Sequence, residues 1–234
     1  MMIEKFLNYL KFELNRSERT VKSYGEDLRA FEEFFKNLDG HPSWESVDSD
    51  IIRDWMESMM DKGNNATSIN RRLSALRSFY RFALARELVV KDPAHDVVGP
   101  KKKKPLPQFL KENEINALLD SDMWEDTYDD MRARTIVMTF YETGMRLSEL
   151  TGLRDADVDF VNHELKVTGK RNKQRIIPFG AELAHTLADY KSLRDATERG
   201  NCGKFFLTDK GLAMQNAQVR EIVKKHLSRA VSYT

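Results

Sequence analysis

Hydrophobic residues recur every three or four positions through the first part of the chain, which is the spacing of the buried face of an amphipathic α-helix. The stripes are Ile3, Phe6, Leu7 and Leu10; Val21, Tyr24, Leu28, Phe31, Phe35 and Leu38; Ile51, Ile52, Trp55, Met56 and Met59; and Ile69, Leu73, Leu76, Tyr80 and Ala83. Ser17 offers a capping hydroxyl before the second stripe, and Gly63-Asn64-Asn65 separates the third from the fourth. We therefore predict a four-helix domain over residues 1–98.

The later part of the chain mixes helical and alternating patterns. Ile136, Val137 and Phe140 lie on one face of a helix that runs into Gly144, a residue suited to a chain reversal. From Asp157 onward apolar positions alternate with polar ones, at Val158, Phe160, Leu165, Val167, Ile176 and Pro178. This alternation predicts a small antiparallel sheet. The expected fold is mainly α with a small β-sheet, and the second domain, over residues 108–234, is α+β.

Charge is segregated along the chain although the net charge is only +1. Residues 64–104 hold ten basic and three acidic residues, a net charge of +7, whereas residues 110–134 hold three basic and eight acidic ones, a net charge of −5. The single Cys202 excludes an internal disulfide and a multi-cysteine zinc site. No N-terminal apolar segment is long enough for export or a membrane span, so we expect a cytoplasmic protein without membrane contact.

A polar stripe on the fourth predicted helix is a candidate DNA-binding surface. Asn70, Ser74, Arg77 and Arg81 share the face opposite the apolar stripe, Arg71 and Arg72 flank them, and Arg19, Thr20 and Ser23 begin the second helix. Such a set combines cations that position phosphates with polar side chains that contact base edges. The alternative is an ordinary solvated helix face.

The segment between the two predicted domains is rich in proline and lysine. Its sequence, Gly99-Pro100-Lys101-Lys102-Lys103-Lys104-Pro105-Leu106-Pro107, cannot continue a helix and favours an extended chain. We therefore predict a linker over residues 99–107. A plain charged spacer is one interpretation, but we favour contact of the four lysines with a phosphate backbone.

The run from Tyr141 to Leu153 contains a candidate phosphate-binding arginine. Arg146 follows Gly144 and begins a short helix whose leucines would face inward. A guanidinium held between two packed helices offers a planar fork of donors to a phosphate. The alternative is a surface arginine that pairs with Glu149.

A second basic motif follows on a different element. Gly169 marks a reversal in the predicted sheet, and Lys170 projects from it, followed by Lys173 and Arg175. An ammonium carries a proton that it can transfer, which a guanidinium gives up far less readily. For Lys173 and Arg175 plain phosphate contacts are at least as reasonable as a chemical role, and all three could be solvated turn charges.

Together the two runs resemble the arginine motif and the lysine hairpin of the tyrosine recombinases (phage-integrase family), especially the Xer-type site-specific recombinases. The first domain resembles the family's core-binding (SAM-like) domain, which places its helices on DNA. The resemblance implies that Arg146 neutralises the scissile phosphate, that Lys170 is the general acid toward the leaving 5′ oxygen, and that Glu149 supports the site. In this family a tyrosine attacks the phosphate and no metal or other cofactor is needed. The implied partners are double-stranded DNA and further recombinase subunits, a tetramer in the family.

The remaining motifs of the family cannot be placed. His226-Leu227-Ser228-Arg229 matches His-x-x-Arg as a string and Tyr233 follows it, but His226 continues a helical pattern and Tyr233 comes too soon after Arg229. We therefore expect a recombinase whose catalytic domain is incomplete in this chain, without its nucleophile. The competing class is a non-enzymatic, sequence-specific DNA-binding protein derived from a recombinase. The residues leave open chromosome-dimer resolution, mobile-element integration and DNA inversion.

Overall fold

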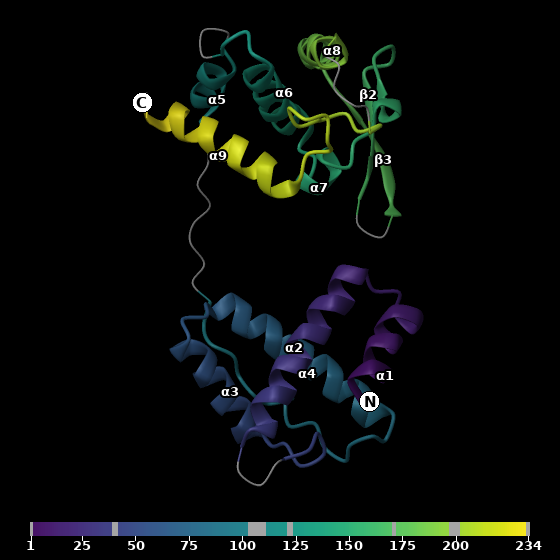
Figure 1. The fold of residues 1–234 in the computed structure, drawn as a ribbon, viewed down its shortest axis with the longest axis vertical. Helices are drawn as coiled ribbons and strands as arrows, with labels where there is room; N and C mark the ends of the chain where they lie inside the picture. Colours follow the sequence, from purple (N-terminus) through teal and green to yellow (C-terminus); the bar gives the residue numbers. More distant parts are fainter. Residues whose placement is uncertain are drawn as a thin grey trace. The chain divides into compact units, whose positions relative to one another are not determined.

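The structure is a computed structural model that describes residues 2–38, 42–102, 111–120, 124–169, 172–196 and 202–232. The chain forms two compact units, Met1–Pro107 and Gln108–Thr234 (Figure 1). The fold predicted from the sequence, mainly helical with a small antiparallel sheet, is confirmed. In the part of the chain that the structure describes, no helix combines the length and the apolar character needed to cross a membrane.

The N-terminal unit contains the helices that its hydrophobic stripes predict. They are α1 (Met2–Asn8), which continues as a π-helical turn (Tyr9–Glu13), α2 (Glu18–Lys36), α3 (Ser49–Asp61) and α4 (Ala66–Ala85). Side chains cap three of the starts: Ser17, Asp48 and Asn65 each accept a backbone N–H of the first turn. Such caps satisfy amide groups that have no partner within the helix, which is why the helices begin at these residues.

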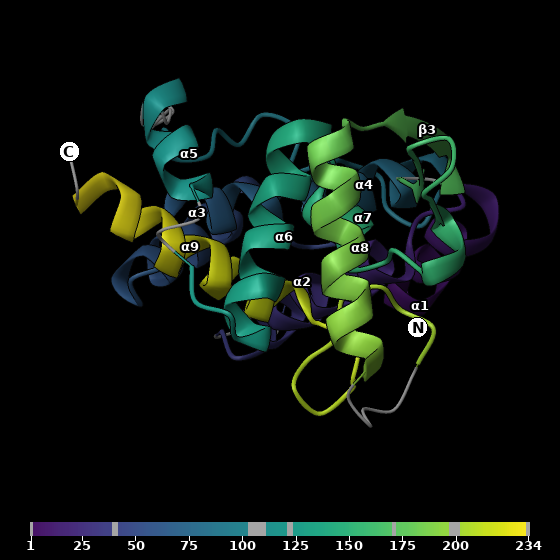
Figure 2. The ribbon, with the colours of Figure 1, turned by 90° about the horizontal axis from the view of Figure 1, so that it is seen from above.

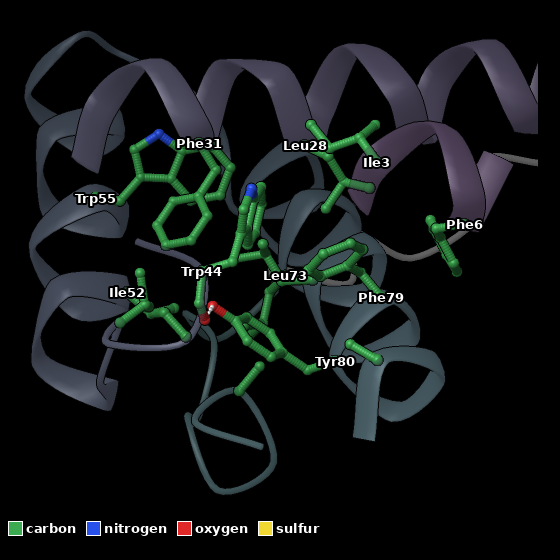
Figure 3. Close-up of a cluster of buried hydrophobic side chains, with 14 of the residues drawn as sticks. Ile3, Phe6, Leu28, Phe31, Trp44, Ile52, Trp55, Leu73, Phe79 and Tyr80 are labelled. Atoms are coloured by element: carbon green, nitrogen blue, oxygen red, sulfur yellow. Dashed lines mark hydrogen bonds between the residues drawn. The ribbon is translucent and has the colours of Figure 1, made fainter. Parts of the chain in front are cut away.

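Aromatic rings fill the centre of this unit (Figure 3). Trp44, which comes from the loop before α3, packs on Phe79 with ring centroids 4.4 Å apart, and Phe31 packs on Trp55 at 4.8 Å. The buried hydroxyl of Tyr80 donates to the carbonyl oxygen of Trp44 at 3.2 Å. Because α4 contributes two of these rings, its opposite face is held in a fixed orientation.

The C-terminal unit joins helices to a three-stranded sheet. Its elements are α5 (Glu112–Leu119), α6 (Tyr128–Thr143), α7 (Leu147–Leu150), the 3₁₀ turn Asp155–Asp157, β1 (Val158–Asp159), β2 (Glu164–Thr168), β3 (Gln174–Pro178), α8 (Ala181–Ala196) and α9 (Asn216–Ser232). The strands are antiparallel in the order β1-β2-β3. Thr168 pairs with Gln174 at the end of the β2–β3 ladder, so the basic turn joins these two strands.

Two buried polar groups fix the core of this unit, in which α6 and α8 lie side by side (Figure 2). The hydroxyl of Tyr190 on α8 accepts the backbone N–H of Leu207 at 3.0 Å and lies 3.2 Å from the hydroxyl of Tyr128 on α6. Arg194 is fully buried and donates to Asp155 at 2.6 Å and to the carbonyl oxygen of Phe205 at 2.8 Å. These contacts tie the loop after α8 to the helices of this unit.

Candidate functional site

Arg146 is positioned by a chain reversal between α6 and α7. Gly144 ends α6 with a φ of +57°, a left-handed conformation that glycine adopts at little cost, and its N–H donates to the carbonyl oxygen of Phe140 at 3.0 Å. Met145 is buried, and Arg146 then takes the capping position of α7, in which Leu150 is fully buried. Packing therefore fixes the backbone on both sides of Arg146, while the arginine side chain is 69% exposed.

The buried carboxylate of Glu149 orients this arginine. Its Oε2 accepts the backbone N–H of Arg146 at 2.8 Å, and its Oε1 accepts from Nη1 of the same residue at 3.0 Å. The Glu149 side chain itself is 0% exposed. A charge-assisted hydrogen bond thus holds one edge of the guanidinium. Within the described residues the other edge has no hydrogen-bond partner.

A second arginine reaches the same carboxylate from β3. Arg175 donates from Nη1 to Oε1 of Glu149 at 2.7 Å and from Nη2 to Oε2 at 2.8 Å, which is the bidentate geometry of a strong pair. From the sequence, Arg175 was expected to contact phosphate or to be a solvated turn charge, and its pairing with Glu149 was not predicted, because only folding brings residues 149 and 175 together. The available signal was Glu149 three residues after Arg146, between Leu147 and Leu150, which were expected to face inward. The structure joins the two motifs through one carboxylate.

The paired arginines determine the charge of Glu149. The Arg175 side-chain hydrogen bonds are the largest influence on its pKa; together with those from Arg146, and against the opposing effect of burial, they lower the pKa from 4.5 to about 2. Glu149 is therefore ionised at neutral pH. It can hold cations in place, but it has no proton to donate.

Gly169 packs directly against this carboxylate. A Cβ added at Gly169 would lie 2.9 Å from Oε1 of Glu149, closer than side chains approach one another, so no larger residue fits without displacing the pair. The Gly169 N–H donates to the carbonyl oxygen of Lys173 at 2.8 Å and closes the turn between β2 and β3. Lys173 is exposed in this turn. Lys170, the expected general acid, lies outside the residues that the structure describes.

In the N-terminal unit, Arg71 joins two parts of the candidate DNA-binding surface. Its guanidinium donates to the hydroxyl of Ser23 on α2 and to both oxygens of Asp27, the second of these at 2.9 Å. Asp27 is buried, and burial, the largest influence, raises its pKa against the opposing charge of Arg71. The structure therefore brings Ser23 and Arg71 together as the sequence analysis grouped them. Arg19 is exposed and Thr20 half-buried at the start of α2.

Arg72 is turned toward the protein. Its Nε lies 3.6 Å from Asp27, and its Nη1 lies 2.8 Å from the sulfur of Met59. The side chain is only 27% exposed. Asp27 therefore lies between the partly exposed Arg71 and the largely covered Arg72. The sequence did not identify Asp27 as the partner of these two arginines.

The polar stripe of α4 is divided between internal contacts and exposed positions. Asn70 donates to the carbonyl oxygens of Ala66 and Pro100, Ser74 donates to that of Asn70, and Arg77 donates to those of Ala94 and Val97. Arg81, in contrast, is exposed with no partner among the described residues, and Lys101 and Lys102 are exposed as well. Lys103 and Lys104 lie outside the described residues.

The histidine of the string that imitates a His-x-x-Arg motif is buried. His226 on α9 is 4% exposed, and its ring stacks on Trp124 with centroids 4.6 Å apart. Tyr233 and the side chain of Arg229 are not among the described parts. Where the structure describes the chain, no group of three or more His, Cys, Asp or Glu side chains is placed to hold a metal ion.

Comparison with known proteins assigns both units to one class. Residues 3–87 match the phage integrase N-terminal SAM-like domain, and residues 108–233 match the phage integrase family. Among solved structures the chain resembles the Tn1549 transposon integrase in complex with transposon right end DNA (TM-score 0.74, 20% identity, 96% of this chain and 78% of that one). It also resembles a lambda integrase dimer bound to a COC′ core site (TM-score 0.69, 14% identity, 98% and 80%). At these identities the likeness concerns the fold.

Sequence relatives narrow the class. The chain is 34% identical to the tyrosine recombinase XerC of Chlorobaculum tepidum in an alignment 250 positions long, which covers 96% of this chain and 74% of the relative. It is also 34% identical to the XerC of Staphylococcus aureus strain JH9 over 226 residues, 97% and 75% of the two chains. The chain belongs to the tyrosine recombinase (phage integrase) family and has Xer recombinases among its homologues. The resemblance inferred from the Arg146 and Lys170 motifs is thereby confirmed.

The charge state of Glu149 leads to a pH-dependent stability prediction. Glu149→Gln should lower the free energy of unfolding by about 2 kcal/mol at neutral pH, because it removes a charged partner from two arginines. A lowered carboxyl pKa stabilises the fold fully above the ordinary value of 4.5, and this contribution is lost as the pH falls toward about 2. Urea unfolding of both proteins at pH 7 and pH 3 should show the difference shrinking. An equal difference at both values would contradict an ionised Glu149.

Proposed function

We propose that this chain takes part in site-specific DNA recombination, binding duplex DNA and supplying Arg146 to the phosphate at which strands are cut and rejoined. One observation carries the proposal: Arg146 is fixed at one edge by the buried Glu149 and exposes its other edge to solvent. A guanidinium in that state needs no reorganisation to receive a phosphate.

The chemistry of the family gives this arrangement a specific use. As a nucleophile attacks a phosphodiester, negative charge develops on the non-bridging oxygens, and a cation already in place stabilises that charge most in the transition state. In the proposed site Arg146 supplies this cation. Glu149 acts through Arg146 and Arg175 as a positioning residue.

The proposal extends to Lys170 as the general acid toward the leaving 5′ oxygen. Support comes from its neighbour Gly169, which packs against Oε1 of Glu149 and so starts the basic turn beside the carboxylate that orients Arg146. A flexible ammonium beginning there carries a proton that it can deliver to an alkoxide. Lys173 and Arg175 border the same turn, and we assign Lys173 to a backbone phosphate.

DNA binding is assigned to the N-terminal unit and the linker. In this proposal residues 1–98 form the core-binding domain, residues 99–107 the linker, and residues 108–234 a portion of the catalytic domain. Arg19, Arg81 and the linker lysines meet phosphates, while Thr20, Ser23 and Ser74 supply polar contacts near the same surface. Recombination further requires several subunits on one DNA, either copies of this chain or a paired recombinase.

Two described tyrosines of the C-terminal unit, Tyr128 and Tyr190, are unsuited to act as the nucleophile. Tyr128 and Tyr190 share a hydrogen bond in the core, and burial, the largest influence, raises the pKa of Tyr190 far above its ordinary value. A buried phenol with such a pKa does not attack a phosphate. The second candidate function, sequence-specific DNA binding without cleavage, rests on the N-terminal surface alone, which does not depend on a nucleophile.

The exposed cation on α4 tests the binding surface. Arg81→Gln should weaken binding to duplex DNA about fivefold and reduce the slope of log affinity against log salt by about 0.9, because one phosphate contact is lost. Arg53→Gln removes the same charge from α3, where Arg53 pairs with Asp50, and should leave both quantities nearly unchanged. Fluorescence anisotropy with a labelled duplex across a salt series measures both. Wild-type binding that is absent at low salt, or indifferent to salt, contradicts the proposal.

Arg146 can be tested in the same assay. Arg146→Gln should lower the affinity about tenfold, the loss of one charge-assisted phosphate contact. Lys191→Gln is the matched control, because Lys191 lies on α8 and pairs with Asp195 at 2.7 Å, so its loss should leave the affinity almost unchanged. Equal effects of the two substitutions would show that Arg146 acts only through overall charge.

A covalent assay tests the missing nucleophile. Incubated with a nicked suicide substrate, this 234-residue chain should form no DNA adduct that survives denaturation, because no tyrosine among the described residues makes a hydrogen bond or ring contact with Arg146. A denaturing gel with labelled DNA shows the outcome. An adduct that disappears in Tyr233→Phe or in Tyr141→Phe would identify the attacking residue and overturn this part of the proposal.

A further inference from the structure

The segment that leads into the linker is bound along the polar face of α4. Arg77 donates from Nε to the carbonyl oxygen of Ala94 at 3.2 Å and from Nη2 to that of Val97. About two helical turns earlier on α4, Asn70 donates to the carbonyl oxygen of Pro100 at 2.8 Å. Contacts therefore move toward the start of α4 as the segment advances, so residues 94–100 run antiparallel to the helix.

Packing supports these hydrogen bonds at one end of the segment. Ala94 and Val97 belong to the core of the N-terminal unit and are 0% and 1% exposed. Val98 is 84% exposed, so hydrophobic anchoring ends there. From this residue to Lys102, the hydrogen bond from Asn70 to Pro100 is the one that joins the described chain to α4.

The fit at Asn70 is close. A Cβ added at Gly99 would lie 2.4 Å from Oδ1 of Asn70, so glycine is required here by the approach of the two segments. Both N–H groups of the Asn70 amide serve as donors, one to Pro100 and one to Ala66 at 2.7 Å. With both donors in use, the amide cannot make the bidentate contact by which asparagine identifies adenine.

We propose that Asn70 and Arg77 are positioning residues that fix the root of the basic linker on α4. Pro100, the last residue they hold, directly precedes Lys101, so the lysines leave the N-terminal unit from a defined point. A fixed root reduces the conformational entropy that the lysines lose when they meet phosphates. The inference rests on the DNA binding proposed above, and it assigns the two side chains to the linker instead of to direct contact with DNA.

Limited proteolysis tests the attachment without DNA. Trypsin cleavage after Lys101 and Lys102 in the full chain, followed by mass spectrometry, should be about fivefold faster in Asn70→Ala, the change expected from losing one hydrogen bond. Gly99→Ala should have a similar effect because its methyl group displaces the segment from Asn70. Asn8→Ala is the matched control: Asn8 is exposed on α1 and its side chain makes no capping hydrogen bond.

A double substitution makes this test specific. The methyl group of Gly99→Ala would collide with Oδ1 of Asn70, and Asn70→Ala removes this atom. The double variant should therefore be cleaved no faster than Asn70→Ala alone. Additive effects would show that the two residues act independently, and cleavage rates equal to wild type in both single variants would overturn the attachment. Thermal unfolding of each variant shows whether the whole unit has been destabilised instead.

The DNA readout separates positioning from direct contact. Asn70 is neutral, so a direct contact to a base would weaken binding without changing the salt slope. As a positioning residue, Asn70→Ala should reduce the slope toward that of Lys101→Gln/Lys102→Gln, and it should add nothing in that background. Weaker binding at an unchanged slope, with unchanged cleavage, would overturn the inference. Wild-type protein that fails to bind DNA would instead overturn the proposed function, and the cleavage experiment would still test the attachment.

Discussion

A single buried carboxylate organises the candidate site. Glu149 has no exposed surface, and an ionised group in that position is tolerated only when hydrogen bonds replace the water that it has lost. Arg175 and Arg146 provide those bonds, and because they come from β3 and the start of α7, the compensation also fixes the sheet against the helix. Gly169 follows from the same constraint, since the turn can approach the carboxylate only without a side chain.

The N-terminal unit also pairs a buried carboxylate with arginines, but there burial and hydrogen bonding combine to a different effect on the carboxyl pKa. Asp27 is buried beside Arg71 and Arg72, yet its pKa is raised, whereas that of Glu149 is lowered to about 2. Each carboxylate receives two hydrogen bonds from one arginine, but Glu149 also accepts a backbone N–H and a side-chain hydrogen bond from Arg146. Hydrogen bonding therefore outweighs burial at Glu149, whereas burial outweighs the arginines at Asp27. In each unit a buried carboxylate holds an arginine whose side chain is partly exposed. The carboxylate with the stronger set of hydrogen bonds, Glu149, lies at the proposed site of chemistry.

What the sequence predicts correctly is local. The four hydrophobic stripes, the cap at Ser17 and the reversal at Gly144 depend on residues within one or two turns, and all are present. The Arg175–Glu149 pair and the contact between Asn70 and Pro100 join residues far apart in the chain, and no periodicity encodes them. A helical pattern shows which face avoids the core, but it does not show which other segment covers that face.

Internal partners of this kind also reduce the charge that residues 64–104 can offer to DNA. The net charge of +7 over residues 64–104 treats every cation there as available, but several of its arginines already have internal partners. Arg71 pairs with Asp27, Arg86 pairs with Glu13 at 2.8 Å, and Arg77 is bound to two carbonyl oxygens. Among the described residues, the charge that is free to release counterions from DNA is therefore found at Arg81, Lys91, Lys101 and Lys102. The contribution of α4 to DNA binding then lies as much in where it directs the linker as in the cations it carries.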